Sequence, residues 1–154
     1  MRKISILIIL IASLLLIAKS GHTFSNEPKG FFALDWGSSA ADLKKVYKDS
    51  ELIKDGKIQW YIPNSGYAQF SGVMARITYQ YFNDELFFVN IYYNNSEDGE
   101  KLVSALKVTY GDPDVIKEDS FEWRGSVTSI TISKTNRVIS FWSNDIMKKS
   151  AAPK

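Results

Sequence analysis

Apolar residues recur at helical spacing in two stretches of the chain. In the first stretch they fall at i, i+3, i+6 and i+7: Ala40, Leu43, Val46 and Tyr47. Ser39 precedes this stripe and Asp42 follows three residues later, an arrangement typical of a capping box with Asp in place of Glu. The pattern predicts a short helix over residues 40–48.

The second helical stretch covers residues 96–110. Val103, Leu106 and Tyr110 share one face at i, i+3 and i+7. Gly111 can adopt the left-handed conformation that ends a helix, and Pro113 cannot continue one. The sequence therefore predicts a helix that ends sharply at Tyr110 and leads back into β structure.

Elsewhere the apolar residues alternate, which is typical of strands. The clearest strand covers residues 75–81, with Ala75, Ile77, Tyr79 and Tyr81 on one face. Asn83-Asp84 turns the chain, and the returning strand repeats the pattern over residues 87–93. Asp55-Gly56 suits a tight hairpin turn. Further strands are expected at 30–36, 52–54, 58–62, 115–118, 120–124, 128–132 and 138–142.

This order predicts an α+β fold, with an antiparallel sheet or sheets and two helices on one face. Residues 30–143 form the single predicted domain. Its two parts, residues 30–94 and 95–143, share the order of a helix followed by strands, which indicates a tandem pseudo-repeat. Whether the two parts form one sheet or two stays open. Residues 21–29 are expected to be a flexible lead-in and residues 144–154 a loose tail.

The N-terminus has the three parts of a secretory signal peptide. Arg2 and Lys3 precede an apolar run over residues 4–18, and Ala18-Lys19-Ser20 provides the small residues of a cleavage site. The run is shorter than the roughly 20 residues that span a bilayer as a helix. We therefore expect a signal peptide over residues 1–20, with an uncleaved anchor as the alternative.

Export changes the meaning of the charge and cysteine counts. Removing Arg2, Lys3 and Lys19 from the 19 basic residues leaves 16 against 17 acidic residues, a net charge near −1. A nucleic-acid partner, which favours a basic surface, is therefore not expected. The chain has no cysteine, so no lipoprotein anchor or disulfide can form. An exported protein without disulfides indicates a bacterial envelope, with a periplasmic or secreted location.

The chain lacks the residues of common catalytic sites. Its single histidine, His22, lies close to the expected cleavage point, and without cysteine there is no thiol nucleophile or thiolate ligand. We therefore expect no cofactor, no metal site and no enzymatic activity. Carboxylates crowd one region and leave acid–base catalysis as an alternative to a solvated acidic turn: Asp112, Asp114, Glu118, Asp119 and Glu122.

Three short motifs resemble those of a loose family of small exported bacterial proteins. They are Trp36-Gly37-Ser38-Ser39 at a helix start, Tyr110-Gly111-Asp112-Pro113 at a helix stop, and Trp123 in the next strand. The layout is also similar to the β-lactamase-inhibitor-protein fold and to BamE-like envelope assembly proteins. These resemblances imply helix-then-sheet units that bind other proteins. The chain lacks the cysteines of both groups, so they imply no particular partner.

Aromatic residues outside the predicted core faces are candidates for a binding surface. Four lie on predicted strands and two in the loop Ile62–Gly72: Tyr61, Phe88, Tyr92 and Trp142, and Tyr67 and Phe70. Tyrosine and tryptophan beside adaptable polar residues suit protein recognition. The alternative is that some of these rings pack against another layer of the fold. Trp36, Tyr110 and Trp123 are expected to be structural.

These features together predict a non-catalytic, exported protein-binding module of the inhibitor, immunity or assembly-factor type. The expected partner is another envelope or secreted protein, and no transmembrane span is expected after signal cleavage. A small-ligand protein that binds glycan, lipid or peptidoglycan fragments is the first alternative. A hydrolase that uses carboxylates alone is the second. The sequence leaves the identity of the partner and the oligomeric state open.

Overall fold

The computed structural model describes residues 24–64 and 67–152 of the chain, and these residues form an α+β fold. The helices are α2 (Ala40–Val46), α3 (Ser96–Tyr110) and α4 (Asn144–Ala151). The strands are β1 (Gly30–Phe31), β2 (Leu34–Asp35), β3 (Ser50–Asp55), β4 (Ile58–Pro63), β5 (Ala68–Phe70), β6 (Val73–Phe82), β7 (Glu85–Tyr92), β8 (Val115–Ile116), β9 (Ser120–Arg124), β10 (Thr128–Ser133) and β11 (Val138–Ser143). The predicted signal peptide and His22 lie outside the described residues.

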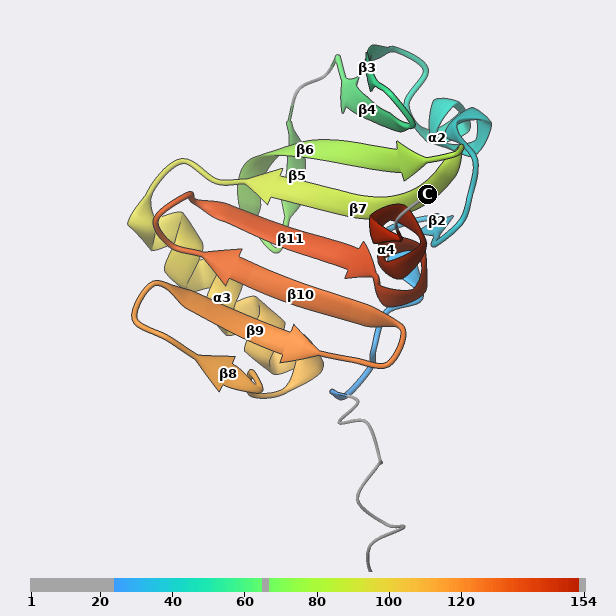
Figure 1. Cartoon of the computed structure of the whole chain (residues 1–154). Coiled ribbons are helices and arrows are strands. Elements are labelled where there is room, and N and C mark those ends of the chain that lie inside the picture. The colour runs from blue at the N-terminus through green and yellow to red at the C-terminus, as the bar shows by residue number, and fades with distance from the viewer. Residues whose placement is uncertain (1–23, 65–66, 153–154) are drawn as a thin grey trace, which may run out of the picture.

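One antiparallel sheet runs through the whole fold, in the order β3-β4-β6-β7-β11-β10-β9-β8. Figure 1 shows β3 at one end of this sheet and β8 at the other. The first half of the chain supplies β3 to β7 and the second half supplies β8 to β11. The halves meet where β7 pairs with β11, with Ile91 opposite Ile139. The two halves of the chain therefore form one sheet.

The two helices predicted from their caps are present. Ser39 and Asp42 form both hydrogen bonds of the capping box at the start of α2. Asn95 caps α3 by accepting a hydrogen bond from the backbone N–H of Asp98. Gly111 ends α3 with a φ of 86°, in the region that favours glycine. Local hydrogen bonding therefore determines where both helices begin and end.

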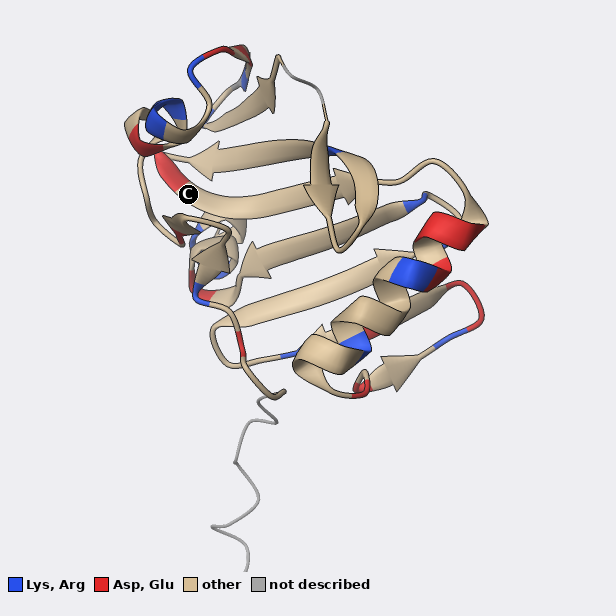
Figure 2. Ribbon diagram, turned by 180° about the vertical axis from the view of Figure 1, so that it is seen from behind, with Lys and Arg blue, Asp and Glu red and all other residues tan. Residues whose placement is uncertain are grey.

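The core lies on one face of the sheet. It contains Tyr79, Ile91, Phe141 and Trp123 from four strands, and α3 covers them with Leu102 and Leu106. Figure 2 shows α3 crossing one half of this face, while β5 and the curled start of β6 cross the other half. α2 lies beside the β6–β7 turn, where Asp84 accepts a hydrogen bond from the N–H of Ala40. The expectation that both helices cover one face is not confirmed.

The first predicted strand, residues 30–36, is a tight hairpin in place of one continuous strand. β1 and β2 pair across two residues, Phe32 and Ala33. Phe32 has a φ of 52°, which is unfavourable for a bulky residue, and its side chain is exposed. Phe31, by contrast, is buried against Phe141, with 5.2 Å between the ring centroids.

The lead-in predicted to be flexible is packed from Phe24 onward. The Phe24 ring is buried and meets the Tyr110 ring edge-on at a centroid distance of 5.5 Å. The Glu27 carboxylate accepts hydrogen bonds from the backbone N–H groups of Val127 and Thr128, at 2.6 and 2.7 Å. The prediction of a flexible segment up to residue 29 is therefore wrong for residues 24–29.

The prediction of a loose tail is also wrong, because residues 144–151 form α4. Ser143 caps this helix and Ile146 is buried. In Figure 1, α4 lies over the sheet on the side opposite α3. Within the part of the chain that the structure describes, no helix combines the length and the apolar character that crossing a bilayer requires.

Candidate recognition surface

The face of the sheet opposite α3 carries a row of large side chains across four strands. Trp60 on β4 lies opposite Gln80 on β6, and Gln80 lies opposite Phe88 on β7. Phe88 in turn lies opposite Trp142 on β11. Directly opposed residues in antiparallel strands point to the same side of the sheet. Trp60, Gln80, Phe88 and Trp142 therefore form one row, here called the aromatic row.

Two rings of the aromatic row are stacked. The Phe88 and Trp142 rings are nearly parallel, with an interplanar angle of 11° and a centroid distance of 5.9 Å. Both side chains remain partly accessible to solvent. Such a pair contributes about 0.5–1.5 kcal/mol beyond the burial of its area. The stack restricts the rotation of both rings.

A bulge in β7 places Phe88 in this row. Tyr81 pairs with Leu86, but the preceding Gln80 pairs with Phe88, which leaves Phe87 as an extra residue. Because of this extra residue, Leu86 faces the core while Phe88 faces the opposite side of the sheet, although the two are only two residues apart. A regular ladder could not satisfy both placements.

Uncharged polar side chains border the aromatic row. Thr78, Asn90 and Ser140 occupy the next row on β6, β7 and β11. The Asn90 Oδ1 accepts a hydrogen bond from the Ser140 hydroxyl at 2.7 Å. The Thr78 hydroxyl is buried and has no hydrogen-bond partner among the described residues. Tyr92 lies further along β7 on the same face and is 36% exposed.

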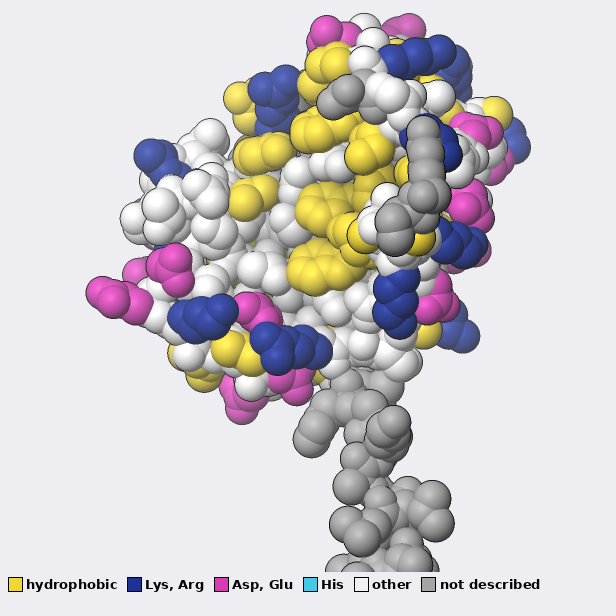
Figure 3. Space-filling model, in the orientation of Figure 1, with side chains coloured by type: hydrophobic (Ala, Val, Ile, Leu, Met, Phe, Trp, Pro, Cys, Tyr) yellow, Lys and Arg dark blue, Asp and Glu magenta, His cyan; other side chains and the backbone are white. Residues whose placement is uncertain are grey.

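Charged residues lie around this face and are scarce in its centre. Figure 3 shows hydrophobic side chains gathered over the middle of the face, with acidic and basic side chains towards its margins. Along the aromatic row the first charged residue beyond Trp142 is Arg124, which pairs with Ser129 on β10. Lys149 of α4 pairs with Glu85 at 3.6 Å. The surface is thus apolar at its centre and charged at its margin.

The structure brings three of the six predicted binding residues to this face: Phe88, Tyr92 and Trp142. Tyr61 is a core residue, only 4% exposed, so its prediction as a surface residue is wrong. The register pairs Tyr61 with Tyr79, which turns it inward, and so Trp60 takes the outward position. Both alternating sets in β4 contain large rings, so the alternation alone could not identify the buried set.

The two predicted loop residues lie away from the aromatic row. Phe70 is on β5 and stacks on Phe31, a core residue of the opposite face, at a centroid distance of 5.9 Å. It is half-buried and acts mainly in packing. Tyr67 precedes β5 and is 53% exposed. Phe70 therefore does not connect the loop Ile62–Gly72 with the aromatic row in one continuous surface.

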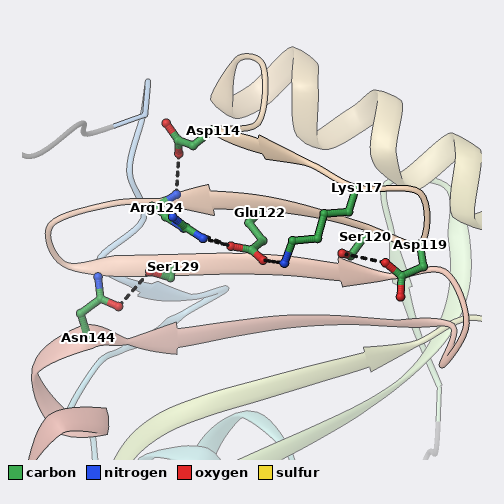
Figure 4. A network of polar contacts seen from close by, with 8 residues as sticks. All are labelled: Asp114, Lys117, Asp119, Ser120, Glu122, Arg124, Ser129 and Asn144. Atoms are coloured by element: carbon green, nitrogen blue, oxygen red, sulfur yellow. Dashed lines mark hydrogen bonds and ion pairs between the residues drawn. The ribbon is translucent and has the colours of Figure 1, made fainter.

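Three residues of the acidic cluster, Asp114, Asp119 and Glu122, form ion pairs or hydrogen bonds (Figure 4). Glu122 pairs with Arg124 and with Lys117, and these two cations, Arg124 first, lower the pKa of the Glu122 carboxyl. The Asp114 carboxylate accepts a hydrogen bond from the N–H of Arg124 at 2.6 Å. Within the described ranges no group of three or more His, Cys, Asp or Glu side chains is placed to hold a metal ion.

A hollow of about 440 Å³ lies beside α3, on the opposite side of the sheet from the aromatic row. Tyr93, Gly99, Val103, Phe121 and Lys134 are among the residues that line it. Its one carboxylate, Glu100, has no second carboxylate beside it in the lining. The hollow therefore lacks the converging acids that glycoside hydrolysis requires.

Two further motif residues have structural roles. The Trp123 indole donates a hydrogen bond to the Gly111 carbonyl at 2.9 Å, and this bond ties the end of α3 to β9. The Trp36 indole donates to the Thr128 hydroxyl at 2.6 Å.

No protein-family model, no curated protein and no solved structure matches the chain. The functional proposal therefore depends on the geometry of the chain itself.

Proposed function

We propose that this chain is a non-catalytic exported protein that binds another envelope or secreted protein through the aromatic row. The stacked Phe88 and Trp142 rings on the sheet face opposite α3 are the observation that carries this proposal. Large rings held in place at a solvent-facing sheet lose little conformational freedom on binding. Aromatic residues of this kind are enriched among the side chains that dominate protein–protein binding energies.

The extent and polarity of the surface support a protein partner. From Trp60 to Trp142 the aromatic row crosses three strand spacings, about 14 Å at the usual ~4.8 Å per spacing. Its centre is apolar and charges lie at its margin, as in protein interfaces with a dry core and a polar rim. A surface of this breadth suits a macromolecular partner better than a small ligand, which usually binds in a concave pocket.

The roles consistent with such a surface are those of an inhibitor, an immunity protein or an assembly factor, in the periplasm or outside the cell. None of these roles requires a catalytic group. The ion pairs of Glu122 and the hydrogen bond that Asp114 accepts from the backbone N–H of Arg124 support a structural role for these two acidic residues. A hydrolase that uses carboxylates alone gains no support from this arrangement.

Affinity capture with ring variants tests the proposal. The immobilised chain should retain a stoichiometric protein from an envelope extract, and Phe88→Ala and Trp142→Ala should each weaken that binding at least about tenfold. Val108→Ala is the matched control, because Val108 is 89% exposed on α3, away from the row. Equal retention by all variants at unchanged Tm would contradict the proposal. Loss of binding with Tyr67→Ala alone would move the site to the loop.

A glycan or other small ligand is the second candidate. Gln80 lies opposite Phe88, and Asn90 lies two residues along β7 from Phe88 on the same face. Sugars are commonly bound by ring stacking together with amide hydrogen bonds. A Tm that rises with the concentration of a soluble peptidoglycan fragment, and no longer does so in Trp142→Ala, would favour this candidate. The absence of any shift at millimolar fragment would leave the protein partner as the better proposal.

A further inference from the structure

β3 presents an open strand edge at one end of the sheet. It pairs over six residues with β4, from Ser50 opposite Pro63 to Asp55 opposite Ile58. On its other side no strand of the described residues pairs with it. An edge of this length exposes a row of backbone donors and acceptors that another extended chain can bind.

The hydrogen-bond pattern shows which groups point outward. The N–H of Asn64 donates to the carbonyl of Asp49 at 2.9 Å, so these two residues form a hydrogen-bonded pair. Such pairs alternate along an antiparallel ladder. Glu51 and Ile53 therefore direct their backbone groups towards β4. Leu52 and Lys54 direct theirs away from the sheet. Backbone N–H and C=O groups at this spacing match those of an extended peptide and of little else.

The opposite edge of the sheet is protected. β8 contains only Val115 and Ile116, and Pro113 precedes it closely. The run Lys117-Glu118-Asp119 follows directly. Short length, proline and charge are the usual means of blocking edge pairing. β3 has neither a proline nor a short length, although it carries the charged residues Glu51 and Lys54. Its apolar Leu52 and Ile53 are exposed, at 39% and 45%.

The open edge is continuous with the aromatic row. Ile53 lies opposite Trp60, the first ring of that row. A strand added beside β3 would place a side chain next to Ile53 on the same face. A partner could therefore cover the rings with one part and extend the sheet with another.

We propose that the partner docks by adding an extended segment to the outer edge of β3, with an apolar side chain beside Ile53. This inference rests on the proposed function, because it describes how the same partner is held. Backbone hydrogen bonds to Leu52 and Lys54 would supply affinity, and the apolar side chain would supply specificity. The occupant is a segment of another protein; a second copy of this chain is an outcome that the test distinguishes.

Amide hydrogen exchange with a defined probe tests the proposal. The probe is a blocked peptide of alternating threonine and valine, acetyl-Thr-Val-Thr-Val-Thr-Val-Thr-amide, added to the full chain at millimolar concentration. Exchange of the Leu52 and Lys54 amides should slow about tenfold when the peptide is present at about ten times its Kd. The Glu51 and Ile53 amides, already bonded to β4, should change little. Unchanged exchange at Leu52 and Lys54 would overturn the proposal.

A proline variant provides the matched control. Leu52→Pro removes one outward N–H without touching the bonds to β4, and edge strands tolerate proline at such a position. It should abolish protection of Lys54 by the peptide, whereas Leu52→Thr should keep it. Protection that persists in a folded Leu52→Pro variant would contradict the proposal. If this variant does not fold, the wild-type exchange pattern still decides the question.

Two further readouts separate the possible occupants and the two proposals. Protection of Leu52 and Lys54 that grows with the concentration of the chain alone, together with a dimeric mass, would identify a second copy and overturn the proposal. Trp142→Ala should leave peptide binding at β3 intact. If the peptide does not protect β3, strand addition is contradicted. If the ring variants do not weaken partner binding, the aromatic row is contradicted. The two results are therefore distinct.

Discussion

Glu27 is the residue that joins the N-terminal segment to the second half of the chain. Its carboxylate accepts hydrogen bonds from the backbone N–H groups of Val127 and Thr128 and from the Ser126 hydroxyl. Nearly 100 residues of sequence separate the partners, so these bonds close a long loop. Phe24 and Trp36 on either side are also packed on the domain. The Glu27 side chain thus ties the N-terminal segment to a turn that Trp36 and Asn144 also contact.

Glu27→Ala is expected to lower the free energy of unfolding by about 1–3 kcal/mol, because hydrogen bonds to a charged group are lost and two backbone donors lose their partner. Urea denaturation of the variant measures this loss. Glu100→Ala, an exposed glutamate on α3, is the control and should change stability by no more than about 0.5 kcal/mol. Equal effects of the two substitutions would argue against the role assigned to Glu27.

Asp42 makes the stability of α2 depend on pH. Hydrogen bonds from the Lys45 ammonium and then from Ser39 lower the pKa of this carboxyl to about 2. A lowered carboxyl pKa stabilises the folded state above the unfolded-state pKa near 4, and this stabilisation is lost as pH falls from about 4 to 2. The difference in urea midpoint between the wild type and Asp42→Asn should therefore shrink across this range. A constant difference would show that Asp42 does not titrate as assigned.

At the scale of single residues, the sequence predicts caps well and strand faces less well. Ser39, Asp42 and Gly111 act through bonds to near neighbours in the chain, so their roles could be predicted from local sequence. Tyr61 and Trp60 differ in burial because of a pairing with β6, which local sequence does not specify. Both residues are large and aromatic, so either could have faced the core.

α4 shows how a short helix can be missed in a sequence. Its residues are mostly polar or basic, and Ile146 is its one buried side chain. The helix forms because Ser143 caps it and because the Ile146 side chain is buried against the sheet. No long apolar stripe marks it, although Lys148 and Lys149 in its last turn and Pro153 just beyond its end are stop signals. α3, in contrast, has a cap, a stripe and a glycine stop, and was predicted to the correct end at Tyr110.

Ile146→Ala tests whether α4 is part of the folded domain. Removing a buried isoleucine side chain typically costs about 2–4 kcal/mol. Lys148→Ala, on an exposed position of the same helix, should cost no more than about 0.5 kcal/mol. Thermal and urea denaturation of both variants measure the difference. If Ile146→Ala were as stable as the wild type, residues 144–151 would be the loose tail that the sequence predicts.

At the scale of the whole molecule, the α+β class and most hairpins could be predicted, but the arrangement of the sheet could not. Hairpins such as β3–β4 depend on a turn dipeptide, which is local. The β7–β11 pairing joins residues about 50 positions apart in the sequence and has no local signal. That pairing unites Phe88 with Trp142, so the candidate site could be predicted as a set of exposed rings but not as a stacked pair.

Charge distribution is a second property of the whole molecule. Figure 2 shows that acidic and basic residues lie mainly on the helices and connecting loops, while the strands carry few of them. One sheet face is covered by α3 together with β5 and the start of β6, and the other is covered only in part, by α4. The exposed apolar part of this face, around Phe88 and Trp142, is the kind of patch that marks an interaction site.

Site-directed photo-cross-linking in cells that produce the chain tests this account most directly. A photoreactive amino acid is placed at position 142 in the aromatic row, and at position 108 on α3 as the control. The account predicts one discrete cross-linked protein from position 142 and none from position 108. A product from position 108 with none from position 142 would contradict it, since the partner would then bind the helix side of the molecule.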